Sequence, residues 1–90
     1  MEGKRNQKWT YIKRKYGLTK EEYFNLIESQ NNRCKICNNI LEGRDTHVDH
    51  CHTTGRVRGI LCFNCNVGLG NFKDSIQFLY NAIHYLEQNK

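Results

Sequence analysis

The sequence of 90 residues has no proline and no long apolar run. Its longest apolar-looking stretch, residues 59–63, is far too short for a membrane span or for the core of a signal peptide. Hydrophobic residues make up only 38% of the chain, and that figure includes five cysteines and five tyrosines. We therefore expect a soluble, cytoplasmic protein that has no membrane as a partner.

The chain is also too short for two independent hydrophobic cores, so we expect a single domain over residues 1–90. With so few apolar residues, burial alone would leave a domain of this size marginally stable, and a further stabilising element is needed. Fourteen Lys and Arg against nine Asp and Glu give a net charge of +5. This excess favours an anionic partner such as nucleic acid.

The cysteines are the best candidates for the stabilising element. Their odd number and the missing signal sequence argue against a disulfide framework. Two Cys-x-x-Cys pairs, separated by twenty-four residues, offer four thiolates to one tetrahedral Zn²⁺: Cys34, Cys37, Cys62 and Cys65. The spacing predicts a structural zinc site that contributes directly to folding, and it leaves Cys51 as a free thiol. A thioredoxin-like redox site would need one pair within alternating strands and helices, a pattern that we do not find.

A basic amphipathic helix is predicted over residues 4–16. Trp9, Ile12 and Tyr16 recur there at i, i+3, i+7 and lie on a face apart from the cations. We expect the cations to bind the DNA backbone, with an affinity that falls with salt and little sequence readout. The alternative is an ordinary solvated helix whose Trp9 face packs on the core. The candidate DNA contacts in this helix are Lys8, Lys13 and Arg14.

Local signals place the next elements. Residues 19–22 form a capping box that starts a second helix, which should reach about Gln30. Asparagines flank the first cysteine pair, as expected where the backbone must turn. Residues 46–50 alternate like a short strand, residues 56–58 are its expected partner, and residues 53–55 supply the turn.

The end of the chain should be helical. The segment after Cys62 is expected to form a helix that Gly68 and Gly70 limit. A final helix is expected from Ser75 to about Gln88. Its apolar residues recur on one face: Ile76, Leu79, Ile83 and Leu86.

The segment between the two cysteine pairs concentrates residues suited to chemistry. Three of the four histidines lie there, together with Asp49: His47, His50 and His52. A carboxylate is a hard ligand suited to Mg²⁺ or Mn²⁺, an imidazole is a general base near neutral pH, and together they support metal-assisted phosphodiester hydrolysis. Asn66 offers a second, neutral oxygen ligand. Arg56 and Arg58 lie beyond the turn, where they would hold a phosphate.

The backbone must be irregular at the centre of this segment. In a regular strand Asp49 and His50 would face opposite ways and would not serve one phosphate. We therefore expect the strand to end or bulge at these two residues, with an irregular loop up to Gly55. His47 and Asp49 share a face if the strand is regular up to that point, and Asn66 is presented from the first turn of the following helix.

Taken together, the motifs resemble the HNH nucleases with a ββα-metal core, specifically the branch typified by phage recombination endonuclease VII. The resemblance covers roughly residues 34–70. It rests on the cysteine pairs, on His-x-Asp-His-x-His at 47–52, and on Gly-Arg-Val-Arg-Gly-Ile-Leu-Cys-x-x-Cys-Asn at 55–66. It implies an α+β fold with a small zinc-stapled ββα-metal (His-Me finger) core and flanking helices. The parts of the single domain are a basic helical part, 1–31, the core with its zinc knuckles, 34–70, and a C-terminal helix, 74–88.

The resemblance also implies roles for residues. Asp49 and Asn66 would hold the catalytic Mg²⁺ or Mn²⁺, His50 would activate water, and His47 and His52 would support the site. The implied function is a metal-dependent DNA endonuclease, a monomer or homodimer that nicks duplex DNA, in the cytoplasm of a bacterial host if a phage encodes it. Cys51 departs from the family pattern, in which an acidic residue is familiar. The chain also stops soon after the core, so we do not expect junction-specific resolution by an intertwined dimer.

Two other hypotheses stay open. One is a non-catalytic, zinc-stapled nucleic-acid-binding module, in which the histidines donate to phosphates and Asp49 is a turn residue. A binder has no reason to keep a carboxylate facing a polyanion unless a cation lies between them, so Asp49, His50 and Asn66 together favour the enzyme. The other is mixed Cys/His zinc ligation through His50 or His52, which would leave two cysteines unused.

Overall fold

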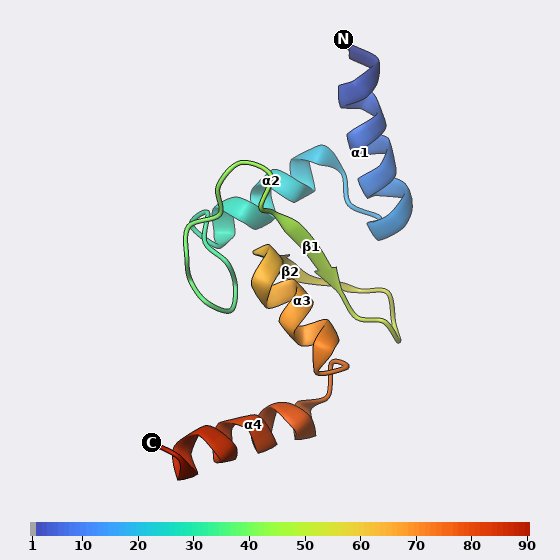
Figure 1. Ribbon diagram of the computed structural model, residues 1–90. Coiled ribbons are helices and arrows are strands. Elements are labelled where there is room, and N and C mark those ends of the chain that lie inside the picture. The colour runs from blue at the N-terminus through green and yellow to red at the C-terminus, as the bar shows by residue number, and fades with distance from the viewer. Residues whose placement is uncertain (1) are drawn as a thin grey trace.

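The computed structural model describes the backbone of residues 2–90 and the side chains of residues 9–90. A two-stranded antiparallel hairpin lies at the centre, with two helices on its N-terminal side and two after it (Figure 1). The elements are α1 (Glu2–Tyr16), α2 (Lys20–Ser29), β1 (His47–His50), β2 (Val57–Leu61), α3 (Phe63–Asn71) and α4 (Ile76–Gln88). This arrangement confirms the predicted α+β class with flanking helices. Within residues 2–90, no helix has the length and hydrophobicity that crossing a membrane requires.

Local signals predicted the end of α1 and both ends of α2, whereas α1 begins at Glu2, before the predicted start at residue 4. Gly17 ends α1 with a left-handed φ of 69°, and its N–H donates to the carbonyl of Lys13 at 2.8 Å. At the start of α2, the N–H of Glu22 donates to Thr19 Oγ1 at 3.1 Å, and the N–H of Thr19 donates to Glu22 Oε1 at 2.9 Å. Both bonds of a capping box are therefore present.

The apolar face of α1 packs on the core. The Trp9 ring lies edge-on to Tyr23 of α2, with centroids 5.2 Å apart, and Ile12 is buried. Lys13 and Arg14 are exposed, so the packed face and the basic face of α1 are separate. The side chain of Lys8 lies outside the described residues. The buried core joins α1 to the first cysteine loop and the hairpin through Ile12, Tyr23, Cys34, Leu41, Ile60 and Leu61.

The hairpin contains the expected irregularity. Its register places His47 opposite Leu61 and Asp49 opposite Gly59, but His50 pairs with Val57. The register shift between Asp49 and His50 confirms the predicted break. The unpaired extra residue lies on β2 and is Arg58, and β2 extends beyond the expected 56–58 to Leu61.

The α3 helix corrects one expectation. Cys62 is its N-cap, and the helix runs through Gly68 to Asn71, so Gly68 does not limit it and the helix ends one residue after Gly70. A glycine inside a helix costs about 1 kcal/mol relative to alanine. Packing of Leu69 against the core offsets this cost.

The α4 helix begins at the predicted place but adds little to the core. Ser75 caps it by accepting the N–H of Phe78 at 3.0 Å. Its apolar face is largely exposed, with Ile76 at 72% and Leu86 at 66% of their full accessible surface. Figure 1 shows that α4 leads away from the hairpin.

Candidate active site and metal centre

The four paired cysteines form one cluster. Their sulfur atoms all lie within 4.8 Å of one another, and the sulfurs of Cys37 and Cys62 are 3.8 Å apart. Ligands about 2.3 Å from a tetrahedral Zn²⁺ are separated by about 3.8 Å, so the cluster has the dimensions of a zinc site. The remaining thiol, Cys51, lies outside the cluster and is free.

Backbone N–H groups prepare this cluster for a cation. Burial by itself raises the pKa of the Cys34 thiol, but N–H donors from Cys62, Cys37 and Ile36 lower it to about 6. The N–H of Cys62 donates to the sulfur of Cys34 at 3.4 Å. Burial and the neighbouring thiols raise the pKa of Cys65 to about 12. The backbone donors therefore favour a negatively charged sulfur at Cys34, which is the form of a thiol that binds a metal ion.

Asp49 carries the one carboxylate side chain of the hairpin, residues 47–61. Arg58 donates to it twice, from Nε at 2.7 Å and from Nη2 at 3.0 Å. The Asp49 side chain is only 12% exposed, and a carboxylate buried to that extent requires a positive partner. The contact raises the pKa of Arg58 above its already high value. Arg58 is the extra residue of the bulge, so the ion pair between Arg58 and Asp49 lies at the register shift of the hairpin.

A second carboxylate shares the same guanidinium. Nη2 of Arg58 lies 3.2 Å from Oδ2 of Asp74, in the turn between α3 and α4. Nε2 of His52, in the hairpin loop, lies 3.7 Å from the same Asp74 oxygen. Residues of the loop, the strand and the turn line a hollow of about 460 Å³: Cys51, His52, Thr53, Arg58, Gly70, Lys73 and Asp74.

His47 contacts Asp45, which precedes β1, and Phe63, at the start of α3. Its Nε2 lies 3.3 Å from Oδ1 of Asp45, and its ring is edge-on to that of Phe63 at 5.8 Å. The same Asp45 oxygen accepts the N–H of Phe63 at 2.6 Å, at the positive N-terminus of the helix. Asp45 therefore links the position of the His47 ring to the start of α3.

His50 and Asn66 lie on the side of the hairpin that faces α1. The His50 ring is 5.4 Å from Tyr16 and 4.8 Å from His52, measured between centroids. Asn66 is in the first turn of α3, as expected, and lines a hollow of about 280 Å³ together with Tyr16 and His47.

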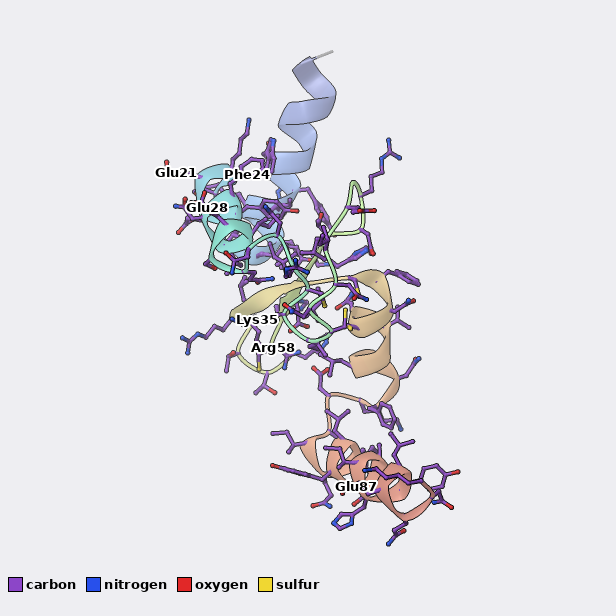
Figure 2. The ribbon with its side chains drawn as sticks, turned by 90° about the vertical axis from the view of Figure 1, so that its left-hand side faces the viewer. Glu21, Phe24, Glu28, Lys35, Arg58 and Glu87 are labelled. Carbon is purple, nitrogen blue, oxygen red and sulfur yellow. The ribbon has the colours of Figure 1, made fainter. Side chains whose placement is uncertain are left out.

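Asp49 lines a different hollow of about 270 Å³, next to Arg58 and Lys35. Lys35 comes from the first cysteine loop and Arg58 from β2, and Figure 2 labels both. Arg56, the other predicted phosphate contact, is exposed at the end of the hairpin loop. The structure therefore gathers the three histidines, Asp49 and Asn66 around β1 and the start of α3. It places Asp49 and Asn66 in separate hollows.

Sequence reasoning missed three charged residues beside these groups: Asp45, Asp74 and Lys35. Asp45 could have been noticed, because it lies two residues before His47. Asp74 and Lys35 had no such signal, since only the folded chain brings the turn after α3 and the first cysteine loop to β2.

Comparison with known proteins agrees with this architecture. The family model for recombination endonuclease VII matches residues 9–88. The Gene 59 proteins of Mycobacterium phages L5 and D29 are 44% and 46% identical over 79 and 81 residues, which are 86% and 88% of this chain. The chain spans about half the length of these relatives, 48% and 49%.

A solved structure shows the same fold. The crystal structure of the ββα-Me type II restriction endonuclease Hpy99I superposes with a TM-score of 0.59 at 31% identity, over 90% of this chain and 48% of that protein. The central hairpin followed by α3, with its four-cysteine cluster, is therefore a ββα-metal core. The match to the family model covers most of the sequence, and the chain belongs to the recombination endonuclease VII family.

Proposed function

We propose that this protein is a metal-dependent DNA endonuclease that hydrolyses phosphodiester bonds and nicks duplex DNA. The observation that carries the proposal is the bulged hairpin of a ββα-metal core, where Asp49 and His50 follow one another at the register shift. Membership of the endonuclease VII family and the net charge of +5 support it. The phage relatives favour action in the cytoplasm of a bacterial host.

The donor set suits a hard divalent cation, because carboxylate and amide oxygens are the ligands that Mg²⁺ and Mn²⁺ prefer. Mg²⁺ or Mn²⁺ held by Asp49 and by the side-chain oxygen of Asn66 would act as a Lewis acid toward the phosphate. Because the two residues line separate hollows, joint ligation requires a side chain to move. His50 accepts a proton from the attacking water, and Tyr16 packs against its ring. His47, fixed by Asp45, and His52 position the phosphate.

The cations around the core bind the DNA. Arg56, on the hairpin loop, and Lys35, beside Asp49, hold the phosphate nearest the site. Lys13 and Arg14 on the exposed face of α1 bind the backbone further away. One such site cuts one strand, so a monomer nicks, and a double-strand break requires either a homodimer or two successive encounters. The four-cysteine cluster binds structural Zn²⁺.

One observation favours a second candidate, a zinc-stapled nucleic-acid-binding module without activity. The Asp49 carboxylate is satisfied by Arg58 and so does not need a divalent ion to remain buried. In such a module the histidines would donate to phosphates.

A plasmid assay separates the two candidates. Zinc-loaded protein is incubated with supercoiled plasmid and either Mg²⁺ or Mn²⁺, beside His50→Ala and the control His84→Ala, which removes an exposed histidine of α4. We expect wild type and His84→Ala to produce open circles, and His50→Ala to be slower by at least about 100-fold. Equal nicking by all three would remove His50 from the chemistry. DNA binding without nicking under every divalent ion would favour the module.

A further inference from the structure

We propose that Asp74 is a positioning residue that receives Arg58 when a divalent cation takes the carboxylate of Asp49. The inference rests on the proposed function, because it assumes that Asp49 is a cation ligand. It adds a residue outside the hairpin and outside the predicted constellation, and it gives Arg58 a task besides phosphate contact.

The first argument is competition for one carboxylate. Arg58 occupies both oxygens of Asp49, with donors at 2.7 Å and 3.0 Å. A cation bound to the same oxygens would meet the guanidinium at close range, and the two positive charges would repel each other. Cation binding at Asp49 therefore requires Arg58 to move. The free energy of this displacement depends on which acceptor the guanidinium finds next.

The second argument is that a partner for the displaced guanidinium is already in contact. Oδ2 of Asp74 lies 3.2 Å from Nη2, the same nitrogen that donates to Asp49. Once Nε and Nη2 leave Asp49, both can donate to Asp74 as a two-bond pair. The hollow of about 460 Å³ beside Arg58 and Asp74 provides space for this movement.

The third argument is the shape of the turn that carries Asp74. Lys73 and Asp74 have φ values of 56° and 54°, in the left-handed region that residues other than glycine rarely adopt. The N–H of Asp74 donates to the carbonyl of Leu69 at 2.9 Å, which holds the turn against the end of α3. This strained turn brings Asp74 back to β2, although the chain then continues into α4 and away from the hairpin (Figure 1).

Cation affinity in a double-mutant cycle tests the proposal without DNA and without catalysis. Mn²⁺ binding to zinc-loaded protein is measured by paramagnetic resonance for wild type, Asp74→Asn, Arg58→Gln and the double variant. We expect Asp74→Asn to weaken Mn²⁺ binding by about threefold or more, because the amide keeps one acceptor oxygen but offers Arg58 neither a negative charge nor a two-oxygen ion pair. We expect Arg58→Gln to strengthen binding, and Asp74→Asn to have a much smaller effect in the Arg58→Gln background.

Controls separate a positioning role from a general one. Glu87→Gln removes one negative charge from the exposed face of α4 and should leave Mn²⁺ affinity unchanged. Asp74→Glu keeps a carboxylate at position 74 and should retain most of the wild-type Mn²⁺ affinity. Zinc content and melting temperature are measured for each variant. An equal loss from Asp74→Asn with and without Arg58 would mean that Asp74 acts on the cation directly, and would overturn the proposal. If the protein does not nick plasmid but the Mn²⁺ affinities of the four proteins follow the expected pattern, the result counts against the nuclease function only.

Discussion

Gln30 and Ile60 lie thirty residues apart and are joined by a pair of hydrogen bonds, like residues on two neighbouring strands. The Ile60 N–H donates to Gln30 Oε1 at 2.9 Å, and Gln30 Nε2 donates to the Ile60 carbonyl at 2.9 Å. The amide also donates to the carbonyl of Arg33 at 2.8 Å. One buried side chain therefore ties the end of α2 to β2 and to the first cysteine loop.

Replacement of Gln30 should destabilise the fold. Gln30→Ala leaves the buried N–H and carbonyl of Ile60 without this partner, and we expect a loss of about 1–3 kcal/mol in the free energy of unfolding. Denaturant unfolding of zinc-saturated protein measures it. Gln77→Ala removes an exposed glutamine of α4 and should change stability by less than about 0.5 kcal/mol. Equal stability of the two variants would contradict the role of Gln30.

Zinc affinity should fall as the pH is lowered, because thiols must lose protons to bind the metal. The pKa of Cys34 is lowered to about 6 from its ordinary value of 9.0. Above pH 6 the folded, metal-free protein holds Cys34 as a thiolate, which releases no proton on binding. Below pH 6 Cys34 is protonated and must release a proton when zinc binds. The slope of log zinc affinity against pH should therefore be larger by about one below pH 6 than above it.

Competition with a zinc chelator, repeated at several pH values between about 5 and 8, measures the zinc affinity and therefore this slope. Cys51→Ser, which changes the thiol outside the cluster, should give the same curve as wild type. A slope that stays constant through pH 6 would show that Cys34 is not a thiolate in the metal-free fold.

Asp45 should matter for both stability and activity. Asp45→Ala removes the acceptor for the Phe63 N–H and the neighbour of His47, and we expect a loss of about 1 kcal/mol together with slower nicking. Asp45→Asn keeps a side-chain oxygen at this position and should retain most of the stability. Thermal unfolding and plasmid nicking are measured in parallel, and full activity in Asp45→Ala would remove Asp45 from the positioning of His47.

The exposed cations of α1 should contribute affinity for DNA but no sequence preference. Lys13→Gln with Arg14→Gln should weaken binding to unrelated duplexes by the same factor. The slope of log affinity against log salt should become shallower by about 0.9 for each phosphate that the variant no longer neutralises. Lys90→Gln, at the end of the chain, is the matched control. An unchanged salt slope in the α1 variant would mean that this helix does not touch the backbone.

The exposed apolar face of α4 shows where periodicity stops being informative. The spacing of Ile76, Leu79, Ile83 and Leu86 predicted an amphipathic helix, and the helix is present from Ile76 to Gln88. Periodicity fixes which residues share a face, but it does not say whether another element covers that face. Within the described chain this face stays mostly open to solvent.

The features that depend on neighbouring residues could be predicted from local patterns. Two Cys-x-x-Cys pairs define a four-thiol set, Thr19 and Glu22 define a capping box, and the opposed facing of Asp49 and His50 requires a break in the strand. Each follows from a spacing rule that acts over a few residues, and the structure contains all of them.

The contacts between distant segments could not be predicted in this way. Arg58 was expected at a phosphate, yet it lies on Asp49 and Asp74, and the amide of Gln30 pairs with Ile60. The α3 helix includes two glycines, and its Leu69 packs on the core. These contacts join segments far apart in the chain, and their energies depend on burial and on partners that no local pattern encodes.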